Sequence, residues 1–568
     1  MIKMNFQRSR KCSMWLRRMF SSRQESEEES LSYDVCVVGA GVSGLSAAIR
    51  MKQKNQNINV CILEKGSTIG SHVLSGNVFD PIYFEELFPN WQNSSNKPPL
   101  TQKVQNESFL ILTENRSYRV PHFLFPNSIK NKDNYIISLG ELCDWMSKEA
   151  ESLGVDIFPG FGGKDLLKGG KGEVIGVKTA DFGIKKNGIK GDDFIKGMKI
   201  YAKQTILAEG ARGSLSSKVI EDFNLRSNGA DPQSYGLGIK EVWHSKNTEP
   251  GLVLHSVGYP LSDSEYGGGF LYTRADELNG GYQIHLGLVT GLDYKNPYLN
   301  PYEEFQRWKS HSDIKRFLKE ATVVKYGARV LNEGGYWAIP NLTFPGGILV
   351  GCSAGFLDVS KIKGSHNAIK SGIIAGDCLS REDIKEGETL DSYQKEMQSS
   401  EIYKELYKSR NFKGGFKKGM IKGMIHGSFT LLLHGKEPWH LRNNKLDSQS
   451  TERSAHHKPI NYPKPDGVYS FNIMESVSRS GTHHDHDQPS HLTIKPSRKD
   501  SPAESLKDYA AFEERFCPAK VYEFIEDDQG NRKLHINAQN CIHCKTCSVK
   551  SLNQYIDWSI PQGGEGPE

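Results

Sequence analysis

The stretch VVGAGVSG, residues 37–44, decides the fold of the first part of the chain. A short β-branched run, residues 34–38 (DVCVV), leads into it, and LSAAIRMKQK follows it with helical apolar spacing. Strand, Gly-rich turn and helix in this order form a dinucleotide-binding unit. In such a unit Gly39 permits the tight turn, Gly41 lets the backbone approach a pyrophosphate, and Gly44 lets the helix pack on the strand.

A second apolar strand, residues 59–63 (NVCIL), ends at Glu64, twenty residues after Gly44. A carboxylate at this distance can accept hydrogen bonds from a ribose, and Lys65, which follows directly, is predicted to belong to the same site. A tight turn that binds no ligand is the alternative. The strand, the helix and the distal acid together argue against it.

The sequence favours FAD over NAD, because no second fingerprint of this kind is found. Instead, residues 204–213 (QTILAEGARG) and 346–355 (GGILVGCSAG) are apolar runs that end in glycines, among them Gly210 and Gly351. Three such strands far apart in the sequence predict one FAD domain interrupted by another domain. Residues 363–379 are expected to form a helix whose N-terminus faces the flavin, where its dipole stabilises negative charge.

Four cysteines near the end of the chain predict a metal centre. Cys541, Cys544 and Cys547 lie in CIHCKTC, and Cys517 precedes a proline 24 residues upstream of Cys541. C-x-x-C-x-x-C places three thiolates on one turn, as around a 4Fe-4S cube, and a Cys-Pro pair usually supplies the fourth. One such set predicts one cluster. Zinc is the alternative and ranks second, because zinc sites more often pair two C-x-x-C motifs.

Two other patterns are less specific. Residues 483–491 (HHDHDQPSH) invite a second metal hypothesis, but their composition favours a solvated, turn-rich loop. Residues 266–270 (YGGGF) alone indicate a bulge or a loop, and alternating runs such as residues 282–292 predict a β-rich substrate domain. No Ser-His-Asp or Cys-His arrangement stands out, so no catalytic side chain is predicted besides the residues that hold cofactors.

The basic residues are concentrated at the N-terminus. The first twenty residues hold six Lys or Arg and no acid, so without them the net charge falls from +5 to about −1. This composition predicts an organellar transit segment, placed over residues 1–24, and a disordered basic tail is the alternative. The near-neutral remainder gives no reason to expect a nucleic-acid partner.

No apolar run is long enough to cross a bilayer, yet residues 415–433 (GFKKGMIKGMIHGSFTLLL) suggest membrane contact. Glycine recurs at every fourth position, so on one helix the glycines share a face and Met420, Met424 and Ile425 lie opposite. We expect the glycine face to pack on another backbone and the apolar face to meet lipid, aided by nearby lysines. An ordinary core helix is the alternative.

Six longer stretches resemble one family. They are YGARVLNEGGYWAIPNLTFPGG (326–347), SKIKGSHNAIKSG (360–372), NYPKPDG (461–467), HDQPSHLT (486–493), RFCPAKVYEF (515–524) and INAQNCIHCKTC (536–547). Together they closely resemble electron-transfer flavoprotein:ubiquinone oxidoreductases, from about residue 33 to residue 567.

The resemblance implies an α/β fold with α+β parts: a glutathione-reductase-like Rossmann FAD domain, an inserted β-rich quinone domain and a ferredoxin-like 4Fe-4S domain. The expected ranges are 33–230 and 325–405 for FAD, 231–324 for ubiquinone, 412–439 for membrane docking, and 447–568 for a linker with the cluster. By the same resemblance the four cysteines bind the cluster, Gly267 and Gly268 approach the quinone, and Asp358 and Gly364 belong to the FAD site.

It also implies that the chain accepts electrons from reduced electron-transfer flavoprotein and passes them through the cluster and FAD to ubiquinone. The expected location is the matrix side of the mitochondrial inner membrane, with monotopic attachment. A one-electron cluster and a flavin that holds two electrons would suit a donor that delivers electrons singly and a quinone that needs two. The family usually has FMNVPKIKG where residues 356–364 read FLDVSKIKG, so Asp358 and Ser360 are departures that bear on the flavin potential.

Two other protein classes are alternatives. A related flavoprotein, such as an isoprenoid reductase or a ferredoxin-linked dehydrogenase, would share the FAD domain but is not expected to combine the quinone-loop and KIKG motifs. A non-catalytic assembly subunit would require lost cofactor residues, and none is missing among the glycines and cysteines.

Overall fold

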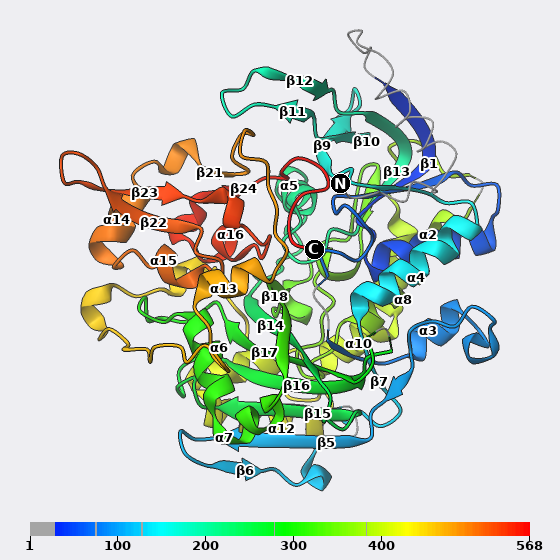
Figure 1. Cartoon of the computed structure of the whole chain (residues 1–568). Helices are drawn as coiled ribbons and strands as arrows, with labels where there is room; N and C mark the ends of the chain where they lie inside the picture. The colour runs from blue at the N-terminus through cyan, green and yellow to red at the C-terminus, as the bar shows by residue number, and fades with distance from the viewer. Residues whose placement is uncertain (1–28, 74–75, 126–128, 278, 382) are drawn as a thin grey trace.

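The computed structural model describes residues 29–73, 76–125, 129–277, 279–381 and 383–568, and two large sheets organise them (Figure 1). The predicted transit segment lies outside these residues. Helices α2, α4 and α8 lie beside the first sheet, on the right of Figure 1. The second sheet occupies the lower centre, and the C-terminal part, in orange and red, lies on the left.

The first sheet begins at the Gly-rich turn. Along its main path the strands run in the order β19-β20-β13-β1-β2-β8, and neighbours there are parallel except β19 and β20. Two further strands, β10 (Val174–Thr179) and β9 (Gly163–Lys168), join it in antiparallel pairs, β10 with β13 and β9 with β10. The bounds are β1 Ser30–Val38, β2 Val60–Glu64, β8 Asp156–Pro159, β13 Lys199–Leu207, β19 Thr343–Phe344 and β20 Gly347–Leu349. The three glycine-ended strands predicted from the sequence, β1, β13 and β20, are therefore neighbours in one sheet.

Glycines let two helices approach each other closely on this sheet. Helix α2 (Val42–Lys54) packs on α8 (Ser365–Leu379), and α4 (Leu139–Ser152) lies next to them. A Cβ atom at Gly372 would lie 2.3 Å from the carbonyl oxygen of Ser43. Only glycine fits this contact, which fixes the middle of α8 against the start of α2.

The second sheet has the order β18-β14-β17-β16-β15-β5-β6, and its neighbours are antiparallel except β15 and β5. The bounds are β5 Asn106–Leu112, β6 Ser117–Arg119, β14 Tyr235–Ser245, β15 Leu252–Gly258, β16 Gly267–Ala275, β17 Tyr282–Gly291 and β18 Thr322–Asn332. The predicted β-rich insertion is confirmed in its secondary structure. The sheet extends beyond the expected range of 231–324, because β5 and β6 join it from residues 106–119.

The C-terminal part consists of two small antiparallel sheets of two strands each and short helices. The strands are β21 Leu492–Ile494 with β24 Ile556–Trp558, and β22 Tyr522–Glu526 with β23 Arg532–Ile536. The main helices are α13 Ile473–Ser478, α14 Ser501–Asp508, α15 Glu513–Phe516 and α16 Thr546–Lys550. Its apolar side chains join one core with those of the second sheet, so the two parts are packed as one body.

The single helix predicted over residues 415–433 is wrong. The chain forms α11 (Phe412–Gly415) and a short 3-10 turn, breaks at Gly419 with φ +109°, and then forms α12 (Met420–Leu433). A Cβ atom at Gly423 would lie 2.2 Å from a ring carbon of Phe416. The glycine face therefore receives aromatic rings rather than a neighbouring backbone. Across the described ranges, no helix has the length and apolarity needed to cross a membrane.

Candidate functional site

A cavity of about 1270 Å³ lies between the two sheets. The Gly-rich turn with Gly39 and Gly41, the end of β2 and the start of α8 form one wall. Residues of β14, β16, β17 and β18 form the opposite wall. The volume is enough for a cofactor larger than a typical drug-sized ligand, and its position at the carboxyl ends of parallel strands is where dinucleotides bind.

The three glycines of the turn have different surroundings. Gly39 has φ +107°, and a Cβ atom there would lie 2.5 Å from the carbonyl oxygen of Ala208. A Cβ atom at Gly44 would lie 2.2 Å from the carbonyl oxygen of Gly39, whereas one at Gly41 would meet no described atom within 4 Å. Contacts within the protein thus require glycine at positions 39 and 44, whether or not a ligand is bound. Gly41 faces open space where a pyrophosphate fits.

Glu64 fixes the turn as well as lining the cavity. Its carboxylate accepts hydrogen bonds from the backbone amide of Ala40 at 3.0 Å and of Gly66 at 2.9 Å. The predicted ribose contact would use the same group, since a carboxylate has further acceptor sites.

Lys65 lines the cavity but reaches towards the C-terminal part. Its Nζ lies 2.7 Å from Nδ1 of His72 and 3.0 Å from Nδ1 of His543, a residue of the CIHCKTC turn. Burial is the main cause that lowers the pKa of Lys65 to about 7, and the Arg329 charge contributes. This link between the flavin edge and the cysteine turn was missed in the sequence, because it joins residues 478 positions apart.

The other predicted FAD residues divide into two groups. Gly210 and Gly364 line the cavity. Gly351 and Asp358 do not: Gly351 donates a backbone hydrogen bond to Ser371 Oγ at 2.9 Å and packs behind the turn. Asp358 belongs to the loop that leads into α8, and its side chain is buried.

Asp358 is 1% exposed and holds this loop closed. Its backbone pairs with Lys363, and its Oδ1 accepts hydrogen bonds from the amide of Ser360 at 3.0 Å and from Ser360 Oγ at 2.7 Å. Burial raises the pKa of Asp358 above its ordinary value, against the lowering effect of those hydrogen bonds. The two departures from the family pattern therefore contact each other, and Lys363 beside them lines the cavity.

The four predicted cysteine ligands come together. Cys517, Cys541, Cys544 and Cys547 are all buried, belong to one core and form no disulfide. Burial and then the neighbouring Cys544 thiol raise the pKa of Cys541 to about 12. Four ionised thiols in such a place need the positive charge of bound iron, so the donor set fits an iron–sulfur cluster.

Strand β18 positions both cysteine segments. The amide of Val330 donates a hydrogen bond to the carbonyl oxygen of Cys544 at 3.0 Å, and Tyr326 Oη donates to the carbonyl oxygen of Pro518 at 2.6 Å. The same strand lines the large cavity, as do Ile542 and Lys545 of the cysteine turn. The cysteine site and the dinucleotide site therefore share a wall.

Buried donors surround the thiols. Thr546 Oγ1 lies 3.3 Å from Cys544 Sγ. Tyr522 Oη and Trp558 Nε1 have no oxygen or nitrogen partner among the described residues, yet they face Cys547 and Cys541 closely enough to influence the pKa of these thiols. Such groups are suited to donate hydrogen bonds to the sulfur atoms of a cluster, which raises its potential.

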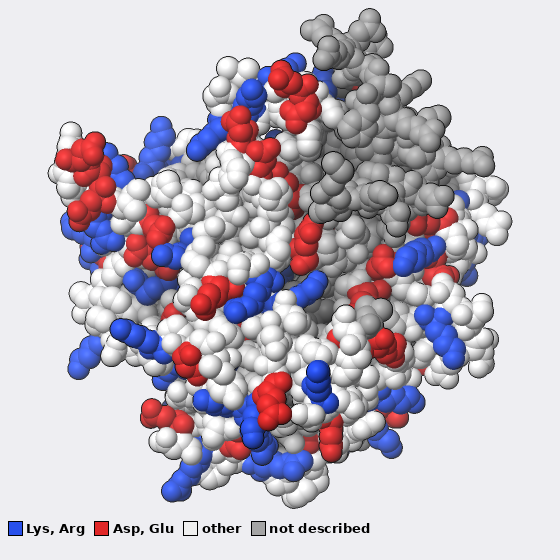
Figure 2. Space-filling view, in the orientation of Figure 1, with Lys and Arg blue, Asp and Glu red and all other residues white. Residues whose placement is uncertain are grey.

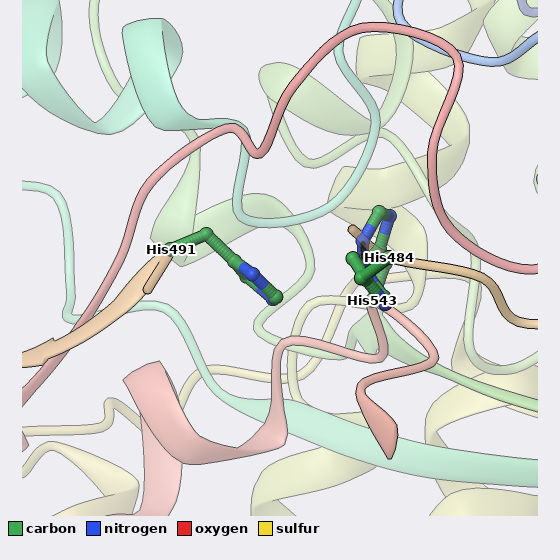
Figure 3. Close-up of side chains that lie close together, drawn as sticks. All are labelled: His484, His491 and His543. Atoms are coloured by element: carbon green, nitrogen blue, oxygen red, sulfur yellow. Dashed lines mark hydrogen bonds between the residues drawn. The ribbon is translucent and has the colours of Figure 1, made fainter. Parts of the chain in front are cut away.

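The expected solvated histidine loop is wrong for two of its members. His484 and His491 are 4% and 3% exposed and gather with His543 (Figure 3). Their ligand nitrogens lie within 4.8 Å of one another, but Nε2 of His484 and Nε2 of His543 are 2.9 Å apart, which is a hydrogen bond. The segment is buried because β21 pairs with β24 and brings both histidines onto the cysteine turn.

The predicted quinone glycines lie at the start of β16, away from the walls of the large cavity. Gly267 pairs with Thr290 and Gly268 with Val289 of β17. The preceding Tyr266 packs on Phe416, with ring centroids 4.9 Å apart. The loop before it contacts α12, because the Ile421 amide donates a hydrogen bond to Asp263 Oδ1 at 3.0 Å. The glycine segment is therefore attached to the predicted membrane segment.

Three protein-family models match parts of the chain. They are "Electron transfer flavoprotein-ubiquinone oxidoreductase, 4Fe-4S" over residues 467–568, "ETF-QO, ubiquinone-binding" over 235–331 and "NAD(P)-binding Rossmann-like domain" over 37–105.

Similar whole proteins include the mitochondrial electron transfer flavoprotein-ubiquinone oxidoreductases of Arabidopsis thaliana and Homo sapiens. The first is 45% identical, with 96% of this chain and 85% of that protein covered. The second is 46% identical, with 94% and 88% covered.

Among solved structures, a geranylgeranyl bacteriochlorophyll reductase-like protein of Thermoplasma acidophilum superposes with a TM-score of 0.50 at 16% identity. The superposition covers 72% of this chain and 92% of that one. At this identity the likeness shows the fold alone.

Proposed function

The chain belongs to the electron transfer flavoprotein-ubiquinone oxidoreductase family, and from this premise we propose how its residues carry out electron transfer from electron transfer flavoprotein to ubiquinone. FAD and one 4Fe-4S cluster are its cofactors. The observation that carries the proposal is the shared wall: Ile542 and Lys545 of the cysteine turn line the cavity that also holds Gly39 and Gly41.

Each segment of the chain has a part in this function. The four cysteines would hold the cluster, the turn with Gly41 would receive the pyrophosphate, and the N-terminus of α8 would face the flavin ring. When bound, the two cofactors supply one-electron and two-electron chemistry. The protein keeps them adjacent, excludes water from the cluster by burying the four thiols, and presents Gly267 and Gly268 as the proposed contact for the quinone.

The test is quinol formation by the purified protein with reduced electron transfer flavoprotein and a short-tailed ubiquinone. We expect quinol to accumulate only when all three components are present. A related flavoprotein with another substrate would oxidise the donor slowly or leave the quinone oxidised, which would contradict the proposal.

We propose that α12 attaches the protein to a lipid surface. Ile421, Ile425, Phe429 and Leu432 are 63%, 57%, 57% and 69% exposed and follow one stripe of the helix. Met420, expected on this face, is buried instead. Lys417, Lys418 and Lys422 are exposed nearby and suit anionic headgroups. Relatives are named mitochondrial, and we place this surface on the matrix side of the inner membrane.

On the face shown in Figure 2, basic and acidic side chains are interspersed and form no single basic patch that would suit an anionic membrane. Membrane affinity is therefore expected to depend on α12.

Replacing Ile425 and Phe429 with aspartate should release the protein from vesicles that contain anionic lipid. Each change removes an apolar side chain worth about 1–2 kcal/mol at the interface, so binding should fall roughly 5- to 30-fold per site. Sedimentation with vesicles measures it, and bound flavin reports that the fold is kept. The matched control is Ile525→Asp, since Ile525 is 51% exposed in the cluster part. Equal release by the control would refute the role of α12.

Asp358→Asn should raise the flavin potential at about pH 8, because an ionised, buried carboxylate opposes electron uptake. An effect on the order of 1 kcal/mol corresponds to roughly 40 mV for a one-electron step. Since burial raises the pKa of Asp358, the carboxyl takes up its proton at a higher pH than an exposed aspartate does. The difference in flavin potential between wild type and Asp358→Asn should therefore become smaller at about pH 5.5.

Potentiometric titration of both proteins at the two pH values tests this. Asp377→Asn, at the far end of α8 and 40% exposed, is the control and should leave the potential unchanged. Equal potentials for wild type and Asp358→Asn at both pH values would contradict the charge argument.

A further inference from the structure

A second, smaller cavity of about 280 Å³ lies on the same face of the second sheet as the large one. Across this face Tyr272 of β16 pairs with Val253 of β15, and Val253 pairs with Glu107 of β5. Side chains at paired positions point to the same side of a sheet. Tyr272 lines the large cavity, while Val253 and Glu107 line the small one. The two cavities are therefore neighbours.

One hydrogen bond joins their walls. His255, which lines the small cavity, has its Nε2 2.9 Å from Tyr272 Oη, and the two rings meet edge to face. Among the described residues no other group hydrogen-bonds either the Tyr272 hydroxyl or His255 Nδ1. One end of the pair thus faces the flavin cavity and the other faces the small cavity.

The pair is built of two neutral groups. Burial raises the pKa of Tyr272 well above its ordinary value. Burial, followed by the charge of Lys363, lowers the pKa of His255 to about 3. A neutral imidazole has one N–H and one acceptor nitrogen, so it can take a proton on one side while it releases one on the other.

The small cavity connects this pair to titratable groups at the surface. Glu107 lines it, accepts a hydrogen bond from the Asn131 amide and contacts Nε2 of His122. The His122 side chain is 52% exposed and that of Glu107 is 16% exposed. The small cavity thus has titratable groups on its solvent side and His255 on its inner side, and its volume is enough for water molecules between them.

We propose that Tyr272 is a catalytic residue that donates one of the two protons taken up by ubiquinone, and that His255 relays this proton from the small cavity. The Tyr272 O–H bond breaks as the new O–H bond forms on a quinone carbonyl oxygen. His255 Nε2–H passes its proton to the tyrosine oxygen, and Nδ1 takes one from the solvent side. The two electrons come from the chain's own reduced cofactors, as the proposed function requires.

Two cations beside Tyr272 are consistent with a quinone oxygen at this place. Lys240 and Lys363 line the large cavity near Tyr272 and Phe270, where positive charge would stabilise an oxygen that gains electrons before its proton. Burial lowers the pKa of each lysine to about 8. Gly268 does not line this cavity, but it precedes Tyr272 by four residues on β16, so the two lie on one face of the strand about 13 Å apart.

The test rests on the proposed function and separates the two ideas. In Tyr272→Phe, quinol formation should fall roughly a hundredfold at unchanged quinone KM, while the donor still reduces the bound cofactors at the wild-type rate. The remaining turnover should lose the solvent deuterium isotope effect of the wild type, because its proton comes by another route. His255→Gln should slow quinol formation less and shift its pH profile. A purely structural hydrogen bond would change neither the isotope effect nor the pH profile.

Matched controls are Tyr302→Phe, which removes a buried hydroxyl that contacts Phe471 and Ser476 outside both cavities, and His457→Gln, which changes a histidine paired with Glu452 outside both cavities. Both should reduce quinone within about twofold of wild type. If Tyr272→Phe forms quinol at the wild-type rate and with the wild-type isotope effect, proton donation by Tyr272 is wrong, whereas the proposed function stands. If wild-type protein itself forms no quinol while its cofactors become reduced, the proposed function and the proton role both fail.

Discussion

Cys544→Ser is expected to remove the iron–sulfur cluster and to lower quinol formation roughly a hundredfold or more, while FAD stays bound. Cys544 is 7% exposed, and its backbone is held by β18 through the hydrogen bond from Val330. The backbone of the turn should therefore survive a change from sulfur to oxygen. What is lost is one of four soft ligands, and a serine hydroxyl is a poor replacement for iron. Iron and sulfide analysis with the flavin absorption spectrum measures both effects.

Cys378→Ser is the matched control, because Cys378 is also buried but lies in α8, outside the cysteine group. It should retain its iron. Zinc rather than iron in anaerobically purified wild-type protein would contradict the cluster assignment, and unchanged iron in Cys544→Ser would contradict this ligand.

Gly41→Ala and Gly44→Ala are expected to fail in different ways. A Cβ atom at Gly41 meets no described atom within 4 Å, and its φ of −79° suits alanine. The FAD-free protein should thus keep its melting temperature, while FAD affinity falls roughly 10- to 150-fold, because one or more charged hydrogen bonds of 1.5–3 kcal/mol to the pyrophosphate are blocked. At Gly44 a Cβ atom would lie 2.2 Å from the Gly39 carbonyl oxygen, so alanine should destabilise the protein even without FAD.

Thermal unfolding of the FAD-free proteins and a flavin-binding titration separate the two cases. Gly170→Ala, in a loop where a Cβ atom also meets nothing within 4 Å, is the control and should bind FAD normally. Full FAD affinity in Gly41→Ala would show that the pyrophosphate does not approach this residue.

The parts of the site that the sequence predicted are those encoded by local spacing. The turn from Gly39 to Gly44 needs glycine because of contacts within a few residues and with one neighbouring strand, so its motif is visible in the sequence. The cysteine turn is likewise a local geometry, and Cys517 was found through its proline. The alternating runs of the second sheet showed strands, because burial on one face leaves a period of two.

The parts that were missed depend on tertiary contacts with no local signal. Nothing near Lys65 indicates that it reaches His543, and the composition around His484 resembles a solvated loop. The periodicity of the glycine-rich segment predicted one helix, since sequence spacing does not show that Gly419 adopts a positive φ and that phenylalanine rings fill the glycine face. Asp358 was placed near the flavin by resemblance, whereas its side chain is directed into the loop.

The first sheet is built from strands that lie far apart in the sequence, and this has a consequence for the synthesis of the protein. Strand β1 is made early, but its sheet is complete only when β20 has been added, and α2 is covered only when α8 follows. A nascent chain therefore carries an open strand edge and an uncovered apolar helix for several hundred residues, which are features that aggregate and recruit chaperones. Because Ile542, Lys545 and Glu568 also line the cavity, the cavity is complete only after nearly the whole polypeptide has been made, and we expect FAD to bind after that point.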